Sequence, residues 1–273
     1  MGVRITSRFV TVEETAKILG VSRRRVRELT RLLDAKVLRR TQRRGKKSKG
    51  DTDPTNLHRI VARLRTVYGN PRHGNPRNPL DDLIYIILST RTRDSSFVST
   101  FRAVKRAFPT WNRLFPKDRR KLERMLIPGG LGRLKARQVV AILAELRRRF
   151  GSATLAPLKR MSNREAEAFL TALPGVGPKI AKCVLMYTLN RRVLPVDVHV
   201  HRVATRLGFK TKKRPDTSQE LIESAVSPEL RYSFHVNAIS LGRSVCLARN
   251  PKCDVCPISG WCQYRRRGRG LKG

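Results

Sequence analysis

Residues 173–181 form a short glycine-rich stretch between two segments whose apolar residues have helical spacing: Leu173-Pro174-Gly175-Val176-Gly177-Pro178-Lys179-Ile180-Ala181. Glycine tolerates positive φ and lets other groups approach the backbone closely, so Gly175 and Gly177 favour a tight turn. Pro178 suits the first turn of the helix that follows. The stretch predicts two helices joined by a hairpin turn. The backbone N–H groups of such a turn, at a helix N-terminus, are suited to hold a phosphate oxygen.

Apolar residues recur at helical spacing along most of the remaining chain. Gly and Pro separate these segments, and no convincing alternating strand pattern is present. The segments cover residues 57–67, 80–88, 97–108, 122–126, 139–150, 166–173, 180–189, 198–207, 221–226 and 234–241. The sequence therefore predicts an all-α fold, with a helical domain over 57–245, a cysteine-bearing loop over 246–262 and a basic tail over 263–273.

The N-terminal part predicts a separate small unit over residues 1–35. Thr11 and Glu14 have the spacing of a capping box, and Gly20 separates two short helical patterns. The stretch resembles the helix-turn-helix of excisionase-like repressor domains, in which the second helix would present arginines 23, 24, 25 and 27 to DNA. An ordinary helical hairpin with a solvated basic face is the alternative. Residues 36–56 predict a flexible basic linker, because eight of the fourteen residues from Lys36 to Lys49 are Lys or Arg.

The charge of the chain restricts its partners. Its 273 residues include 60 Lys and Arg against 20 Asp and Glu, a formal net charge of +40. Such a surplus destabilises a compact protein by self-repulsion unless a polyanion neutralises it. DNA and RNA fit best, because neutralised phosphates release condensed counterions. An anionic membrane is a weaker candidate, since no lipidation signal or basic anchor is present. Charge alone leaves open a passive nucleoid or ribosomal protein.

The location of the protein follows from what its sequence lacks. No run of about 18 apolar residues occurs, which argues against a membrane span. The stretch Met1–Val12 has no apolar segment of the kind that a signal peptide needs. We expect a soluble, monomeric, cytoplasmic protein that is associated with the nucleoid and not with a membrane.

Lys179 and Asp197, eighteen residues apart, are the strongest candidates for chemistry. A lysine whose pKa is lowered by surrounding cations can attack an electrophilic carbon and form a Schiff base. A nearby carboxylate can stabilise the positive charge that develops on a sugar as an N-glycosidic bond breaks. The alternatives are a phosphate-binding Lys179 and an Asp197 that only caps the helix starting at Val198.

Four cysteines near the C-terminus have the spacing of metal ligands: Cys246-x6-Cys253-x2-Cys256-x5-Cys262. A reducing compartment disfavours disulfides, so closely spaced thiols indicate a metal site. Four thiolates suit either zinc or a [4Fe–4S] cluster, and spacing alone does not distinguish them. The fifth, Cys183, is interpreted as a small buried hydrophobic residue.

Together the hairpin with Lys179, the downstream Asp197 and the cysteine spacing resemble endonuclease III and the wider helix-hairpin-helix DNA glycosylase superfamily, from residue 58 to about 264. The resemblance implies a two-lobed helical glycosylase domain, a [4Fe–4S] cluster on the four cysteines, and a partner that is double-stranded DNA with a damaged base or an abasic site. It assigns the Schiff-base nucleophile to Lys179 and the essential aspartate to Asp197. It places Gly175, Val176 and Gly177 against DNA, with His199 and Arg202 orienting groups or contacting phosphate.

Two further segments resemble those with which the family opens the duplex. Leu88–Asp94 corresponds to a segment in which endonuclease III has Gln where this chain has Arg91. The arginine could contact guanine through its bidentate fork, or could contact a phosphate. Gly130–Ala136 resembles the wedge loop, with Leu131 and Leu134 as wedge candidates and Gly132 in place of Tyr. The alternative for both leucines is core packing.

The resemblance leaves several functions to be compared. Adenine-removing relatives carry a catalytic Glu where this chain has Tyr85, so adenine excision is disfavoured. We expect a bifunctional DNA glycosylase and abasic-site lyase of base excision repair that acts on an oxidised pyrimidine and cuts the strand by β-elimination. The alternatives are a monofunctional glycosylase for mismatched thymine or modified cytosine or uracil, and a non-catalytic DNA-binding or regulatory protein.

Removal of residues 1–54 tests the role of the basic N-terminal part. We expect weaker DNA binding and a flatter salt dependence, because fewer phosphates are neutralised. Chemistry at Lys179 should persist. Affinity measured across a salt series, with borohydride trapping of the enzyme on saturating abasic-site DNA, checks both points. Loss of trapping in the truncated protein would contradict the prediction that residues 1–54 contribute DNA affinity and are not needed for the chemistry.

Overall fold

The computed structural model describes residues 54–72, 74–90, 92 and 96–268, all of which belong to the unit Thr52–Gly273. The expected helix-turn-helix unit, nearly all of the linker, Arg91 and the last five residues lie outside this described part. The first described helix, α3, covers Pro54–Tyr68 and thus begins three residues before the expected domain boundary at 57. Within the described residues no helix is long and apolar enough to cross a membrane.

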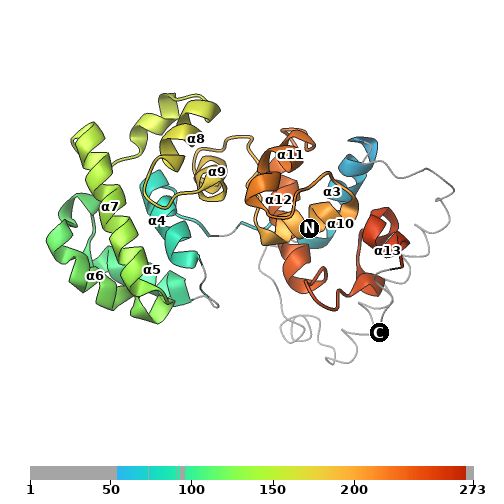
Figure 1. Ribbon diagram of the computed structural model, residues 1–273, viewed down its shortest axis with the longest axis horizontal. Helices are drawn as coiled ribbons and strands as arrows, with labels where there is room; N and C mark the ends of the chain where they lie inside the picture. Colours follow the sequence, from blue (N-terminus) through green and yellow to red (C-terminus); the bar gives the residue numbers. More distant parts are fainter. Residues whose placement is uncertain (1–53, 73, 91, 93–95, 269–273) are drawn as a thin grey trace, which may run out of the picture. The chain divides into compact units, whose positions relative to one another are not determined.

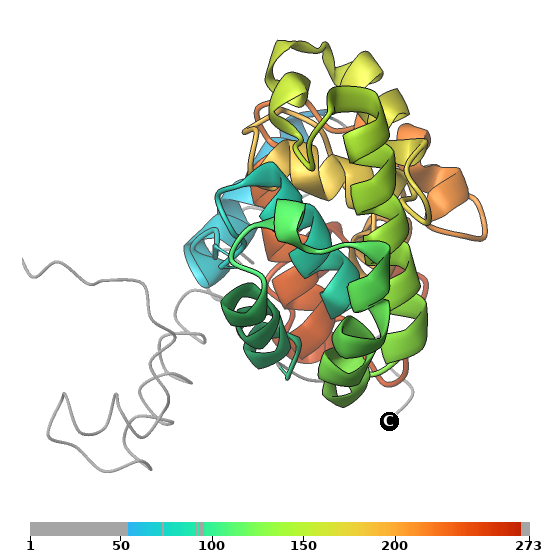
Figure 2. The same cartoon turned by 90° about the vertical axis from the view of Figure 1, so that its left-hand side faces the viewer.

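The all-α prediction is confirmed for the described residues, which contain helices and turns and no strand. Six α-helices form a first group around one buried core, on the left in Figure 1 and toward the viewer in Figure 2. They are α4 (Pro79–Ser89), α5 (Ser96–Ala107), α6 (Arg119–Leu126), α7 (Gly132–Phe150), α8 (Asn163–Thr171) and α9 (Pro178–Tyr187).

The remaining helices surround a second core, on the right in Figure 1. They are α3, α10 (Val198–Leu207), α11 (Gln219–Ser224), α12 (Arg231–Ser244) and α13 (Gln263–Arg266). Because α3 packs against α12, the described part of the chain starts in this group, forms the first group and then returns to the second. Short 3₁₀ turns lie at Trp111–Arg113, Pro116–Asp118, Ile127–Gly129, Ala156–Arg160, Asp216–Ser218, Cys253–Val255 and Ser259–Trp261.

Local sequence signals explain where the helices of the first group begin. Asn78 caps α4, because its side-chain oxygen accepts hydrogen bonds from the backbone N–H of Leu80 at 2.9 Å and of Asp81 at 3.2 Å. Pro79 follows at the first helical position, where its missing N–H costs nothing. Ser162 begins α8 through a capping box with Glu165. These caps fix the start of α4, the helix that forms one wall of the site described below.

A buried lysine links the two groups of helices. Lys182 on α9 places its ammonium 2.6 Å from a carboxylate oxygen of Glu167 on α8 and 2.8 Å from one of Glu223 on α11. Its side chain is only 7% exposed, so water screens these ion pairs weakly. Glu223 also accepts a hydrogen bond from the backbone N–H of Leu194 at 3.0 Å. The pairs therefore fix α9 relative to the chain segment that leads into α10.

Gly132, which stands where endonuclease III has Tyr, is required by packing inside the first group. A Cβ at this position would lie 2.9 Å from the backbone nitrogen of Ile127 and 3.0 Å from the carbonyl oxygen of Glu123. Those atoms belong to backbone and cannot rotate away. Glycine therefore lets the start of α7 lie directly against the end of α6.

Gly132→Ala should destabilise the protein by about 1–3 kcal/mol, because the α6–α7 contact must open to admit the methyl group. Gly177→Ala is the matched control, since its φ is −90° and a Cβ there would meet nothing within 4 Å. Thermal unfolding of the two variants checks the difference. Equal melting temperatures for both would contradict the packing explanation.

Candidate active site

A cleft of about 880 Å³ lies between the two groups of helices. Its walls come from the loop before α4, from α4 and α9 of the first group, and from α10 and α12 of the second. Lys179 and Asp197 both line it, so the structure brings together the two residues that the sequence singled out. The other lining residues are Asn75, Tyr85, Ile86, Ser89, Thr90, Thr92, Phe97, Cys183, Tyr187, Val198, His199, His235, Ile239 and Arg243.

Lys179 lies in the first turn of α9, directly after Pro178. Its pKa is raised, first by Cys183 and then by Asp197, while burial and the charge of Arg243 act in the opposite direction. The expectation of a lowered pKa is therefore wrong, because carboxylate and thiol neighbours outweigh the cations. Lys179 holds its proton at neutral pH and must lose it before it can act as a nucleophile.

Asp197 caps a helix and also lines the cleft, so its capping does not keep it away from the candidate site. Its Oδ1 accepts hydrogen bonds from the backbone N–H of His199 at 2.9 Å and of Val200 at 2.8 Å, which caps α10. The same residue lines the cleft. Capping holds the carboxylate rigidly at the helix N-terminus, and no described residue bonds its Oδ2. The second oxygen is therefore left for a ligand in the cleft.

Arg202 is hydrogen-bonded to three groups near the cleft. Its guanidinium donates to the carbonyl oxygens of Cys246 at 2.8 Å and Gly242 at 2.7 Å, and to Nδ1 of His199 at 3.0 Å. These bonds occupy the guanidinium of Arg202. The geometry therefore fits a role in orienting His199 and does not fit a contact with phosphate. Burial lowers the pKa of His199, whose ring lines the cleft as a neutral imidazole.

The two glycines of the hairpin turn differ in backbone conformation. Gly175 has φ of +69°, and a Cβ there would lie 2.7 Å from the side chain of Gln138, which donates to the Gly175 carbonyl at 2.9 Å. Gly177 has φ of −90°, so of the two glycines only Gly175 adopts the positive φ that glycine allows. Val176 is buried. Only Gly175 is thus required by the fold, and the open space at Gly177 suits close approach of a ligand.

Leu131 and Leu134 project from the protein surface. They are 45% and 57% exposed, so the core-packing alternative is wrong. Leu131 has φ of +57°, an uncommon conformation for a leucine. Both line an open groove of about 460 Å³ with Gly175 of the hairpin. Buried Lys135 on the same segment donates to the carbonyl of Leu88 at 2.8 Å, which ties the leucines to the end of α4.

None of the four C-terminal cysteines forms a disulfide, and each is partly buried. Cys246, Cys253 and Cys262 all contribute to raising the pKa of Cys256, after burial, which places them near one another. Arg206 of α10 donates to Sγ of Cys246 at 3.1 Å and to the carbonyl oxygen of Leu247 at 2.7 Å. Within the described residues, no three His, Cys, Asp or Glu side chains have the spacing of a single-ion site. The donor chemistry, four thiols beside an arginine, fits a cluster of sulfur-ligated iron.

Comparisons with known proteins agree with this geometry. Residues 84–228 match the family described as HhH-GPD superfamily base excision DNA repair protein. The chain belongs to this superfamily. Residues 246–262, which span the four cysteines, match the iron-sulfur binding domain of endonuclease III. The chain is thus an endonuclease III-like DNA glycosylase, and its cofactor is a [4Fe–4S] cluster.

Individual relatives cover most of the described part of this glycosylase. Endonuclease III of Thermotoga maritima is 30% identical over 201 residues, which cover 73% of this chain and 90% of that protein. Endonuclease III of Sulfolobus acidocaldarius is 30% identical over 195 residues, 70% of this chain and 84% of that protein. A solved non-covalent endonuclease III–DNA complex has a TM-score of 0.66 at 25% identity and covers 79% of this chain and 98% of its own. The solved structure of a thermostable thymine-DNA glycosylase shares the fold, with a TM-score of 0.67 at 20% identity. The match covers 80% of this chain and 100% of that one.

Sequence reasoning gave no functional role to Asn75 and Cys183, which line the glycosylase cleft, or to Asp82, which is buried behind Asn75. Asp82 on α4 is fully buried, and Cys183, interpreted as a buried hydrophobic residue, is buried close enough to Lys179 to raise its pKa. Asn75 lines the cleft and donates to Asp82 at 2.5 Å. An aspartate within the apolar run of α4 was the only available signal. Burial raises the pKa of Asp82 to about 7, although Asn75 and Lys179 act in the opposite direction.

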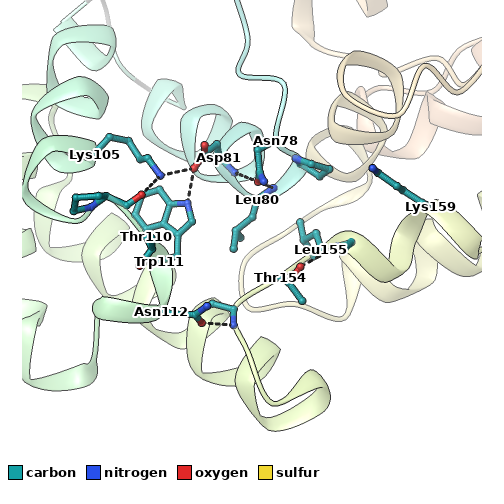
Figure 3. Close-up of a pocket in the computed structure, with 14 residues that line it drawn as sticks. Asn78, Leu80, Asp81, Lys105, Thr110, Trp111, Asn112, Thr154, Leu155 and Lys159 are labelled. Carbon is teal, nitrogen blue, oxygen red and sulfur yellow. Dashed lines mark hydrogen bonds and ion pairs between the residues drawn. The ribbon is translucent and has the colours of Figure 1, made fainter.

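The neighbouring carboxylate, Asp81, belongs to a different pocket. This pocket of about 410 Å³ is shown in Figure 3. There Asp81 pairs with Lys105 at 3.0 Å and accepts from Nε1 of Trp111 at 2.6 Å. None of the residues that line the cleft of Lys179 lines this pocket. Of two consecutive acids of α4, Asp81 thus lines this pocket, whereas Asp82 is buried beside Asn75 of the other cleft. Asp81 is therefore a natural control for Asp82.

Asp82→Asn should stabilise the protein at pH 8. The folded-state pKa of about 7 lies above the ordinary carboxyl value, so the folded state binds more protons between these values. Stability therefore falls as pH rises toward 7, and the isosteric amide removes this loss. We expect a gain on the order of 2–4 kcal/mol at pH 8 that shrinks toward pH 5, measured by thermal unfolding.

Asp81→Asn is the control, since it breaks a satisfied ion pair and should give no gain at pH 8. The carboxyl of Asp82 is faced by Lys179, Cys183 and Tyr187 from α9 and by Tyr85 from its own helix. A change in melting temperature for Asp82→Asn that is the same at pH 5 and pH 8 would show that Asp82 is not a buried charge.

Proposed function

We propose that this glycosylase is bifunctional: it releases an oxidised pyrimidine from double-stranded DNA and then cuts the strand at the abasic site through a Schiff base on Lys179. The observation that carries the proposal is the convergence of Lys179 and Asp197 in one cleft. Their charges lie close enough for Asp197 to raise the pKa of Lys179. An amine and a carboxylate at such range supply both the nucleophile and the counter-charge that the reaction needs.

The first chemical stage breaks the bond between the base and the sugar. Asp197 stabilises the positive charge that develops at C1′ as the base leaves with the bonding electron pair. The raised pKa of Lys179 means that it starts as an ammonium. One of its protons passes to the departing base, which leaves neutral, and the resulting amine attacks C1′. The site thus generates its nucleophile from the same step that creates the electrophile.

The second stage cuts the strand. The new C1′–N bond becomes a protonated imine as the sugar ring opens and O4′ takes a proton from the nitrogen. Water then takes a proton from C2′, the electron pair of that C–H bond forms the C2′=C3′ double bond, and the 3′ phosphate leaves with its bonding electron pair, which is β-elimination. Water hydrolyses the imine and returns Lys179 as an amine. No group outside this chain, DNA and water is required.

Surrounding segments would bind and open the duplex. The open backbone at Gly177 is suited to a phosphate oxygen, as are the N–H groups of the hairpin. Exposed Leu131 and Leu134 are suited to fill the space that an extruded base leaves. Arg91 is proposed to contact the opposite strand, and residues 1–35 to add DNA affinity. We propose a monomer that acts on the chromosome in the cytoplasm.

The cysteine loop would support this interface. Cys246, Cys253, Cys256 and Cys262 are proposed to hold the [4Fe–4S] cluster, which supplies rigid cross-links between loop segments. Arg249 and Lys252 on the loop are exposed and suited to phosphate contact. The loop is joined to α10 through Arg206, so its geometry is coupled to the helix that Asp197 caps.

Borohydride reduction tests the proposal, because it converts the protonated imine into a stable covalent adduct. Wild type on abasic-site DNA should give an adduct and a nick, and Lys179→Ala should reduce both to background. Lys159→Ala, an exposed lysine of the other pocket, should leave both unchanged. The readout is a gel shift of labelled DNA.

Each alternative has its own outcome in this assay. Base release from a damaged duplex without adduct would indicate a monofunctional glycosylase. Tight binding with neither base release nor adduct, over oxidised, deaminated and mismatched substrates, would indicate a non-catalytic DNA-binding protein. Either result would reject the lyase.

A further inference from the structure

Asp82 and Asn75 form a hydrogen-bonded pair in the wall of the cleft, where the proposed chemistry does not use them. Asp82 is fully buried, its Oδ1 accepts from Nδ2 of Asn75 at 2.5 Å, and no described residue bonds its Oδ2. Asn75 is only half-buried and lines the cleft beside Lys179. A buried carboxyl that is only partly satisfied destabilises the fold, so its presence calls for a functional reason.

The pair fixes the direction of the Asn75 amide. An ionised carboxylate only accepts hydrogen bonds, so Asn75 must turn its NH₂ group toward Asp82. The carbonyl oxygen of an amide points away from its nitrogen, and no described residue donates to Oδ1 of Asn75. Lys179 supports this arrangement, because its charge favours the ionised form of Asp82. Asn75 therefore carries an acceptor that is held in one orientation, on a residue that lines the cleft.

We propose that Asn75, oriented by Asp82, is a specificity-determining residue that reads an N–H donor on the edge of the extruded base. This inference rests on the proposed function, since it concerns the base that enters the cleft of Lys179. A fixed carbonyl oxygen accepts from the N3–H of a uracil or thymine derivative or from the 4-amino group of a cytosine derivative. A base without a donor there would leave the oxygen unpaired and be rejected.

Asp82 is a positioning residue in this arrangement, because it acts through Asn75. If Asp82 were replaced by Asn, the new side chain could either donate or accept, and the Asn75 amide could turn over. The shape of the wall would be kept while the orientation would be lost. Asn75→Ala removes the acceptor itself. The two variants therefore separate the reading group from the residue that orients it.

The test compares base release with imine trapping at pH 8, above the Asp82 pKa of about 7. Duplexes carry 5-hydroxyuracil, which has the N3–H, or 5-hydroxycytosine, which has the 4-amino group. Base release is measured in single turnover after hot alkali, which reveals abasic sites without the lyase. Trapping is measured on preformed abasic-site DNA, which has no base to read. The rate of base release is divided by the rate of trapping on the same preparation of protein, and this ratio corrects for any loss of folded protein.

For Asn75→Ala we expect this ratio to fall at least about tenfold for one or both bases, the cost of one hydrogen bond to the reacting ligand. The base whose release slows shows which group, the N3–H or the 4-amino group, donates to Asn75. Asp82→Asn should reduce the ratio for the same base by a smaller factor. Asn112→Ala, which removes an amide outside the cleft in the pocket of Figure 3, should leave the ratio unchanged.

Other outcomes separate this inference from the proposed function. An unchanged ratio for both bases in Asn75→Ala would overturn the inference while leaving the lyase intact. Trapping by wild type with release of neither base would also overturn it, together with the choice of oxidised pyrimidine. Base release that depends on Asn75, without any trapping, would support the inference and reject the lyase.

Discussion

The ammonium of Lys182, held between Glu167 and Glu223, is the interaction on which the geometry of the cleft depends. Lys182 lies one helical turn after Lys179 on α9, whereas Glu223 belongs to the second group of helices. From Glu223 the contacts continue to the backbone of Leu194, three residues before Asp197. A desolvated charge with two partners tolerates little displacement, since separating them leaves a buried charge unpaired. The distance between nucleophile and carboxylate is set through this chain of contacts.

The cleft concentrates groups that a stable core would exclude. Asp82 is buried with one oxygen that no described residue bonds, Cys183 is buried near Lys179, and Asp197 caps a helix while lining the cavity. Burial strengthens the electrostatic interactions among them, because little water is present to screen their charges. The same burial destabilises the folded state. Ion pairs such as Lys182 with its two glutamates, and the two apolar cores, offset this cost elsewhere in the fold.

Much of the fold could be predicted because its signals are local. The apolar spacing of α4, α9 and α10 identifies each as a helix, and Asn78 and Pro79 mark where α4 begins. The hairpin residues and the cysteine spacing identify the family, and with it Lys179 and Asp197. The protonation of Lys179 could not be predicted in this way. It depends on Cys183 and Asp197, whose distances from the ammonium are properties of helix packing.

The sequence by itself determined the helices, the order of the motifs and the residues able to carry out the chemistry. These features depend on helix periodicity, capping and ligand spacing, which involve residues close together in the chain. Only the tertiary structure decided which of them meet. It placed Asp81 in one pocket and buried Asp82 beside Asn75 of the other, since consecutive residues of a helix lie about 100° apart around its axis. It also left Gly177 open while filling the space beside Gly132. Burial, and therefore proton affinity, arises only when distant helices pack.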